Sequence, residues 1–328
     1  MKSETLKLET QQKYLKFANH FYATWLPDGV ITSARIRAAL VSAAQNYRPA
    51  SFRLLKNALA FDQRAKGYTA TAREILATVN PVTEGGSKMP VKPKQARAKS
   101  FTQQQFDELS RYLHTNGYHD EFFALVLAWY CGVRPCEMRT IKTHGAEIHI
   151  TGGKCSHSGT RGADRVLVIA EAPILNLVAY SAQMMSQCQR SDGAIRDRMR
   201  NEVRRVWPRR KTHPTLYTLR HQFGSNLKAS GADDKVLAYM MGHQSTSSIE
   251  RYGDKRCGDA SLIKVKPLAA INLDKVRARD GNKKPWAVDA DRQRQVSQPG
   301  RVIDTLSLGQ VACTSLVSAS AGVSDGNR

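Results

Sequence analysis

The chain lacks any long apolar run. No window reaches the roughly 18 uninterrupted apolar residues of a membrane-spanning helix. The first residues, MKSETLKLETQQKY, contain no apolar stretch of the kind that forms the core of a secretory signal. We therefore expect no membrane span and a cytoplasmic location.

The chain also lacks clustered metal ligands. Its six cysteines form no CxxC pair, and its nine histidines show no spacing typical of a zinc site. Carboxylates do not gather as a nuclease with bound metal would require. We expect reduced thiols, no metal and no cofactor.

Acidic residues are scarce relative to basic ones. The chain has 50 lysines and arginines against 28 aspartates and glutamates, so its formal net charge is +22, spread along its length. Such a field attracts polyanions, and nucleic acid is the leading candidate. The alternatives are a merely basic protein and one drawn to an anionic membrane surface. A length of 328 residues predicts about two domains.

Residues 1–80 have the periodicity of a small helical, basic domain. Ile36 and Leu40 fall on one face of one segment, and Phe52, Leu55 and Leu59 fall on one face of the next. Residues 81–101 then lose periodicity and are rich in Gly, Pro, Lys and Arg, which predicts a linker. Its cations are candidates to follow a phosphate backbone, although an ordinary solvated linker has the same composition. These cations are Lys88, Lys92, Lys94, Arg97 and Lys99.

Residues 102–256 predict a second domain that is mainly α with one small antiparallel sheet. Thr102 and Gln105 fit a capping box, and EFFALVLAWYCG is apolar all round, as in a fully buried helix. Short strands are expected at 146–150 and 164–170. Further helices are expected at about 173–190, 193–207, 214–230, 233–241 and 246–253. Residues 257–328 form a tail, in which 275–328 lack the apolar pattern of a folded segment.

Two arginines, a lysine, a histidine and a tyrosine in this second domain suit the cleavage of a DNA phosphodiester without metal. Fixed guanidinium groups can stabilise the charge that grows on the phosphate, and a tyrosine hydroxyl can attack it and hold the strand as an ester. GVRPCE (132–137) and GGK (152–154) supply an arginine and a lysine, and residues 215–253 supply the rest. The candidate catalytic residues are Arg134, Lys154, Tyr217, Arg220, His243 and Tyr252.

The order and spacing of these motifs resemble the catalytic domain of the tyrosine recombinases, or phage integrase family. The intervals are 20 residues from Arg134 to Lys154, 23 from Arg220 to His243 and 9 from His243 to Tyr252. Residues 1–80 resemble, more weakly, the family's helical core-binding domain. The resemblance implies two arginines and His243 on the phosphate, Lys154 as the proton donor to the leaving 5′ oxygen, and Tyr252 as the nucleophile.

The chain departs from the family at one position. The family's His-x-x-Arg is replaced here by Tyr217-Thr218-Leu219-Arg220. A tyrosine hydroxyl can donate a hydrogen bond to phosphate, but its reference pKa of about 10 makes it a poor proton shuttle near neutral pH. His213 and His221 are candidates for a substitute imidazole, although His221 is expected to face away from Arg220 because it is about 100° further round the helix.

Alternative roles remain open for several of these residues. Arg134 alone would pair with Glu137 as surface structure, and Arg161 and Arg165 compete with Lys154. His243 would otherwise cap a helix, and Tyr252 would otherwise be a buried structural tyrosine, as expected for Tyr239.

The resemblance implies a site-specific DNA recombinase of a mobile element or a bacterial chromosome, acting on the nucleoid. It implies a homo-tetramer on two duplexes that carry a specific site, with a DNA-bending or directionality factor as a further partner. Family members often carry a short segment after the tyrosine that docks on a neighbouring protomer, and residues 261–273 are the candidate for it; the alternative is that the whole tail is disordered and dispensable. The alternatives are a type IB topoisomerase or telomere resolvase, and a DNA-binding accessory protein whose pocket has decayed.

Overall fold

The computed structural model of the chain describes residues 6, 8–153 and 163–278. The chain divides into two compact units, Met1–Ala96 and Arg97–Arg328. In the described residues no helix is both long enough and apolar enough to cross a bilayer.

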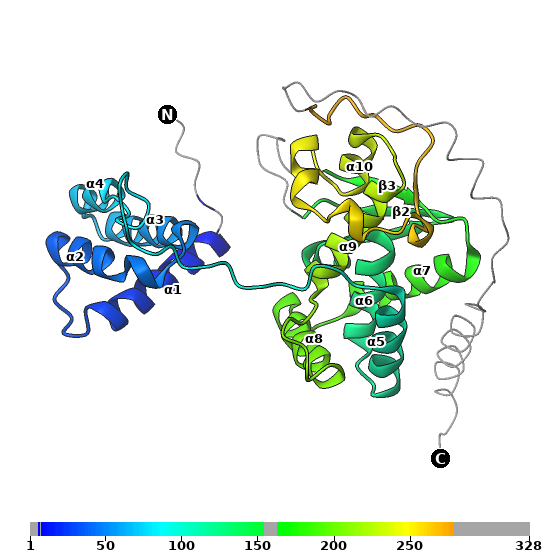
Figure 1. The fold of residues 1–328 in the computed structure, drawn as a ribbon, viewed down its shortest axis with the longest axis horizontal. Helices are drawn as coiled ribbons and strands as arrows, with labels where there is room; N and C mark the ends of the chain where they lie inside the picture. The colour runs from blue at the N-terminus through cyan, green and yellow to red at the C-terminus, as the bar shows by residue number, and fades with distance from the viewer. Residues whose placement is uncertain (1–5, 7, 154–162, 279–328) are drawn as a thin grey trace, which may run out of the picture. The chain divides into compact units, whose positions relative to one another are not determined.

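The first unit is helical and has its own core (Figure 1). The faces predicted from periodicity are confirmed, because Ile36, Leu40 and Leu59 are fully buried and Phe52 and Leu55 nearly so. Residues of both α1 and α3 contribute to this core. The elements are α1 (Leu8–Trp25), α2 (Ser33–Ala43), a short 3-10 turn η1 (Ala44–Asn46), α3 (Pro49–Ala65) and α4 (Thr69–Ala77).

The stretch from 81 to 101 contains no helix or strand, but both of its ends are packed. Val82 belongs to the core of the first unit, and Phe101 belongs to the core of the second. Lys92 donates a hydrogen bond to the carbonyl oxygen of Asn46 at 2.7 Å, so the middle of this stretch is tied to the first unit. The other four basic side chains predicted to follow DNA are exposed.

The second unit is mostly helical and contains one antiparallel four-stranded sheet, so the predicted fold class is confirmed. The strand order is β1-β2-β3-β4. The strands are β1 (Lys142–His144), β2 (Glu147–Ile150), β3 (Arg165–Val168) and β4 (Lys266–Pro267). The helices are α5 (Gln103–Thr115), α6 (His119–Cys131), α7 (Ala172–Gln187), α8 (Asp192–Val206), α9 (Leu216–Ala229) and α10 (Asp234–Met240). Four 3-10 segments complete it: η2 (Pro135–Thr140), η3 (Thr246–Arg251), η4 (Lys255–Cys257) and η5 (Ala260–Leu262).

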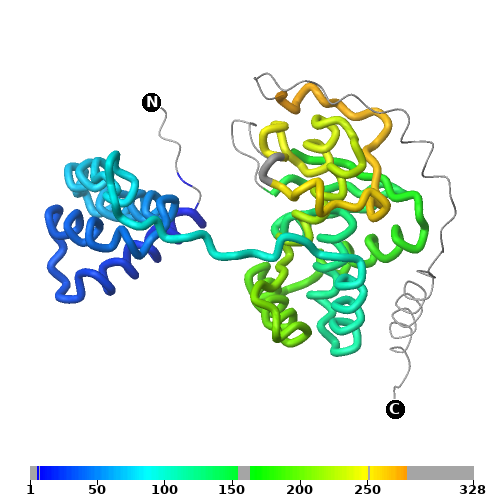
Figure 2. The backbone as a smooth tube through the Cα atoms, viewed as in Figure 1, coloured from blue at the N-terminus to red at the C-terminus, as the bar shows by residue number. Residues whose placement is uncertain are grey.

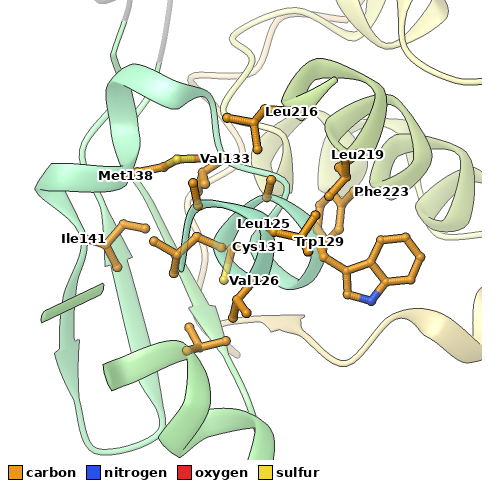
Figure 3. Close-up of a cluster of buried hydrophobic side chains, with 14 of the residues drawn as sticks. Leu125, Val126, Trp129, Cys131, Val133, Met138, Ile141, Leu216, Leu219 and Phe223 are labelled. Carbon is orange, nitrogen blue, oxygen red and sulfur yellow. The ribbon is translucent and has the colours of Figure 1, made fainter. Parts of the chain in front are cut away.

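Helix α6 forms the centre of this unit (Figure 3). It is apolar on every side because α5, α7, α8 and α9 all pack against it. Trp129 stacks on Phe106 of α5 with ring centroids 5.0 Å apart. The predicted capping box of Thr102 and Gln105 is present at the start of α5.

The segment after η5 packs on the rest of the second unit (Figure 2, orange). Strand β4 pairs with β3, and Val265 and Val276 are buried in the same core as α6. Arg277 also makes two backbone hydrogen bonds. Its amide donates to the carbonyl oxygen of Gln244 at 3.0 Å, and its carbonyl oxygen accepts from the amide of Thr246 at 3.1 Å. Residues 261–273, expected to dock on a neighbouring protomer, are thus packed in cis here, because their apolar side chains complete the local core.

Candidate active site

Glu137 is the centre of a buried cluster of charged side chains. Its carboxylate forms ion pairs with Arg134 and with Arg165, the latter at 3.0 Å, and lies 3.9 Å from a guanidinium nitrogen of Arg220. Glu137, Arg165 and Arg220 have fully buried side chains, and that of Arg134 is 7% exposed. Arg134 thus pairs with Glu137, as expected if it had only a structural role. The pair is buried, however, and does not lie on the surface as that alternative supposed.

Local backbone geometry places Arg134 in this cluster. Helix α6 ends at Gly132, whose φ of +57° is left-handed, and Pro135 begins η2. A β-carbon at position 132 would lie 2.1 Å from the ring of Phe223, so glycine also allows α9 to approach. The amide of Arg134 donates to Glu137 Oε2 at 3.0 Å, which fixes the turn.

Arg220 is placed by α9 and held by two backbone carbonyl groups. Its guanidinium donates hydrogen bonds to the carbonyl oxygens of Gly132 and Met241. Burial, followed by the charges of Arg134 and Arg165, lowers the pKa of Arg220 to about 10, so the group still carries its charge at neutral pH. The end of α6 and the end of α10 therefore meet at this one side chain.

His243 follows the reversal at Gly242, where φ is +62°. Its Nε2 atom lies 3.3 Å from Nη2 of Arg220, and because a guanidinium only donates, Nε2 accepts and the ring proton is on Nδ1. Burial, followed by Arg220, Arg134 and Arg165, lowers the pKa of His243 to about 3. His243 is therefore a neutral imidazole at physiological pH.

The pocket has more hydrogen-bond donors than acceptors. Burial alone would raise the pKa of Glu137, but Arg165, Arg134 and Arg220 lower it to about 2, so three guanidinium groups face one carboxylate. Among the described residues, four buried N–H groups here have no partner: Nε and Nη1 of Arg165, Nε of Arg220 and Nδ1 of His243. An excess of buried positive charge and free donors suits an anion such as a phosphate.

Tyr252 lies against this pocket, directly after η3. Its ring centroid is 4.8 Å from that of His243 and 5.1 Å from Cζ of Arg220. The pKa of Arg134 is raised. Burial alone would lower it, but the charge of Glu137 and, to a smaller extent, the nearby hydroxyl of Tyr252 raise it. The structure thus brings together four predicted residues: Arg134, Arg220, His243 and Tyr252.

His221 is rotated from Arg220 on α9 as expected, but this rotation does not turn it away from the pocket. Its ring centroid lies 4.9 Å from that of Tyr252, and its Nδ1 accepts a hydrogen bond from the amide of Gly253 at 3.4 Å. The 100° offset from Arg220 does not point His221 to solvent, because the chain carrying Tyr252 passes over both positions of α9. His213 is instead bonded to the carbonyl oxygen of Trp207 at 2.9 Å.

The other two predicted catalytic residues are Lys154 and Tyr217. Lys154 and its competitor Arg161 lie outside the described residues, although Gly153, at the described end of that loop, donates its amide to Glu137 Oε1 at 3.3 Å. Tyr217 is half-buried in the first turn of α9, three residues before Arg220.

Tyr239 is structural, as expected. Its hydroxyl accepts a hydrogen bond from the amide of Val166 at 2.9 Å, which ties α10 to β3.

The motifs in the sequence did not indicate that Arg165 and Glu137 form a buried ion pair at the centre of the site. Arg165 is buried beneath Gly242, where a β-carbon would lie 2.6 Å from its Nη1 atom. A signal was available: Arg165 shares the inward face of its strand with Leu167, so its charge had to be placed in the interior. A buried cation of this kind needs a carboxylate partner, and Glu137 supplies it.

Within the described ranges, no group of three or more histidine, cysteine or carboxylate side chains is placed to hold an ion. Residues 99–257 match the model of the phage integrase family. No curated protein matches the chain.

Solved structures of lambda integrase are similar to this chain in fold. A lambda integrase dimer bound to a COC′ core site has a TM-score of 0.52 and 18% identity, with 77% of this chain and 74% of that chain covered. A lambda integrase tetramer bound to a Holliday junction has a TM-score of 0.50 and 15% identity, with 83% and 76% covered. A dimer of lambda integrase residues 75–356 on the same core site has a TM-score of 0.50 and 18% identity, with 75% and 92% covered.

The fold and the site define a DNA-cleaving and rejoining enzyme that has a tyrosine beside a cluster of arginines. Residues 99–257 belong to the phage integrase family and form a tyrosine recombinase catalytic domain.

Proposed function

We propose that the chain is a site-specific recombinase that breaks and rejoins DNA through a covalent 3′-phosphotyrosyl intermediate. The observation that carries the proposal is the cluster around Glu137, where three buried guanidinium groups and a neutral imidazole stand beside the ring of Tyr252. Charged donors fixed before the reaction stabilise developing charge best, because they need no reorganisation in the transition state.

In the proposed reaction, the hydroxyl oxygen of Tyr252 attacks the phosphorus atom, and the bond from phosphorus to the 5′ oxygen breaks. The phenolic proton is released, and the 5′ oxygen takes up a proton, for which Lys154 is the proposed donor. Arg134 and Arg220 stabilise the non-bridging oxygens, and Nδ1–H of His243 donates to one of them. The 5′-OH of a second duplex then attacks the ester and releases Tyr252, so no ATP is needed.

We propose the same partners that the resemblance implies. These are duplex DNA with a specific site, three further copies of the chain on two duplexes, and a DNA-bending or directionality factor. The exposed Lys88, Lys94, Arg97 and Lys99 support backbone contacts by the stretch between the units. Integration, transposition or resolution of a mobile element is the proposed setting, on the cytoplasmic nucleoid.

Tyr217 favours one alternative function. A type IB topoisomerase or telomere resolvase would use a similar pocket without histidine at this position. Relaxation of a supercoiled plasmid that lacks the preferred site would support that alternative. Buried Arg134 and Arg220 argue against a decayed accessory protein, because unused buried charges are costly to retain.

The proposal is tested with a suicide substrate. Duplexes that the protein binds are first selected from a random pool. A nick is then placed near each phosphate in turn, so that cleavage there releases a short fragment with a 5′-OH. This fragment diffuses away and cannot rejoin, which traps the covalent adduct. The expected result is a protein–DNA adduct that survives denaturation, is absent with Tyr252→Phe, and maps to a phosphotyrosine at position 252. Adduct formation by Tyr252→Phe would eliminate Tyr252 as the nucleophile, and a wild-type protein that binds the pool without forming any adduct would contradict the proposed reaction.

A further inference from the structure

One stripe of α9 supports the corner formed by Tyr252 and Gly253. His221, Gly224, Ser225 and Lys228 are spaced by three, one and three residues, so they lie along one face of the helix. Arg220 is the neighbour of His221 and projects about 100° away from it. A single helix therefore holds both a phosphate-binding guanidinium and the chain that carries the proposed nucleophile.

Two side chains of this stripe bond to the backbone of Gly253. Nδ1 of His221 accepts from its amide at 3.4 Å, which is a long hydrogen bond, and Nζ of Lys228 donates to its carbonyl oxygen at 2.9 Å. The ring of His221 also packs on that of Tyr252, with an angle of 30° between their planes. The corner is thus held at both of its backbone polar groups and at the tyrosine ring.

The other two positions allow a close approach of the two backbones. A β-carbon on Gly224 would lie 3.3 Å from the β-carbon of Tyr252. Gly253 has a left-handed φ of +62°, and a β-carbon there would lie 2.2 Å from Oγ of Ser225 and 2.5 Å from the carbonyl oxygen of His221. Only glycine fits such a site without a shift, because both its φ and its surroundings exclude a side chain.

We propose that His221 is the principal positioning residue for Tyr252, and that with Lys228 it fixes the tyrosine relative to Arg220 on the same helix. The proposal rests on the assignment of Tyr252 as the nucleophile. Its physical advantage is that the angle between the nucleophile and the phosphate-binding arginine is set by one rigid element. Positioning of this kind matters because a misplacement of about 1 Å can slow a reaction by about 100-fold.

The protonation of His221 explains why it positions Tyr252 and does not act as its base. Nδ1 accepts from an amide, so the ring proton of the neutral form is on Nε2. Burial, followed by Arg97, Arg220 and Lys228, lowers the pKa of His221, which keeps the ring neutral near pH 7. Nδ1, the nitrogen that could accept a proton from Tyr252, already accepts the hydrogen bond from the amide of Gly253. His221 does not restore the proton shuttle that the family's histidine would supply at Tyr217.

A spectroscopic test needs no DNA. The full chain is labelled with 3-fluorotyrosine, and the resonance of Tyr252 is assigned by its loss in Tyr252→Phe. Stacking between two imidazole rings should shift this resonance, so His221→Ala should move it. Lys228→Met should also move it, because the corner loses its second backbone contact. His144→Ala, on exposed β1, is the control and should leave it in place. A Tyr252 resonance unmoved by both His221→Ala and Lys228→Met would overturn the proposal.

A kinetic test separates this inference from the proposed function. Adduct formation is followed in a single turnover with saturating suicide duplex. His221→Ala should slow it about 10- to 100-fold with unchanged DNA affinity. His221→Asn, whose amide oxygen can replace Nδ1 as acceptor, should recover part of the rate. An adduct that persists with Tyr252→Phe would refute the proposed nucleophile, whereas a dead Tyr252→Phe with a wild-type rate for both His221→Ala and Lys228→Met would refute only the positioning role.

Discussion

Nε2 of His243 lies 3.3 Å from Nη2 of Arg220, and this contact determines which nitrogen of the imidazole carries the proton. The arginine cannot accept, so the imidazole must, and Nδ1–H is left as a buried donor without a partner in the described part of the chain. An arginine thus prepares a neutral histidine to donate to an anion. Burial, together with the same arginine charges that are proposed to bind the phosphate, lowers the pKa of the histidine and keeps it uncharged.

This arrangement predicts an acid-sensitive fold. The pKa of His243 is about 3 in the folded protein and about 6.5 when unfolded, so below pH 6.5 the unfolded chain binds a proton that the folded chain does not. Stability contributed by the neutral ring is therefore present above pH 6.5 and is lost as pH falls from there towards 3. His243→Gln should reduce the loss in unfolding free energy between pH 7.5 and 5 by up to about 2 kcal/mol.

Urea unfolding at the two pH values measures this difference. Some pH dependence should remain in the variant, because the pKa of His221 is also lowered. Glu137 does not interfere, since its pKa of about 2 places its contribution between pH 4.5 and 2. An identical pH dependence in wild type and His243→Gln would contradict the assignment of a neutral His243.

Glu137 should be required for stability as well as for catalysis. Glu137→Gln keeps the shape but removes the carboxylate that Arg134, Arg165 and Arg220 share. Breaking a buried ion pair costs about 3–5 kcal/mol, so a large fall in unfolding free energy is expected. Glu147→Gln is the control, because Glu147 pairs with His149 at the surface, where a pair contributes about 1 kcal/mol or less. Equal effects of the two substitutions would mean that the buried cluster does not stabilise the fold.

The sequence predicted which residues form the site better than it predicted what surrounds them. Spacing located Arg134, Arg220, His243 and Tyr252, and the structure gathers these four in one pocket. Helical phase alone gave the wrong surroundings for His221, since it describes one helix and not the chain that crosses it. The place of Arg165 depends on a strand pairing with Ile150 and on the reversal at Gly242, which are tertiary features.

The fold was predictable where periodicity was strong. The buried helix α6 and strands β2 and β3 follow from apolar pattern, and each lies within a few residues of its predicted range. β4 was missed because it has only two residues, Lys266 and Pro267, and no pattern of its own. Its position is set by pairing with β3 and by the burial of Val265 beside it.

The two arginines should contribute differently to catalysis and stability. Arg134→Lys should slow adduct formation by about 100-fold or more, because a lysine cannot reproduce the fork that grips a phosphate. DNA affinity should change little, since the net charge of +22 leaves many other cations to attract the phosphate backbone. Arg220→Lys should also lower the melting temperature, because Arg220 holds the carbonyl groups of Gly132 and Met241. Wild-type single-turnover rates in either variant would refute the phosphate-binding role of that residue.

DNA binding should depend steeply on salt, and part of that dependence should come from the stretch between the units. Changing Lys88, Lys94, Arg97 and Lys99 to alanine should reduce the slope of log K against log salt by up to about 0.9 for each phosphate that the variant no longer neutralises. Lys92 is left in place because it bonds to Asn46. Gel-shift titrations from low to moderate salt measure the slope. A slope equal to that of wild type would show that these four cations do not bind phosphates.

Two truncations of the C-terminal segment should show whether it acts in folding of its own chain or in strand exchange between protomers. A chain ending after residue 278 keeps every described residue, so it should melt like the full chain and form the adduct at the same rate. A chain ending after Gly258 loses β4 together with buried Val265 and Val276. Burial of a valine contributes roughly 1.5–3 kcal/mol, so the shorter chain should be markedly less stable.

The shorter chain should also cleave DNA more slowly. It lacks the backbone bonds between Arg277 and the segment from Gln244 to Thr246, which leads to Tyr252. Thermal melts and single-turnover cleavage of both chains provide the comparison, with Val265→Ala as a milder test of the same core. If the chain ending after Gly258 keeps the stability and cleavage rate of wild type and loses only strand exchange, the segment acts between protomers and its packing in cis is not required.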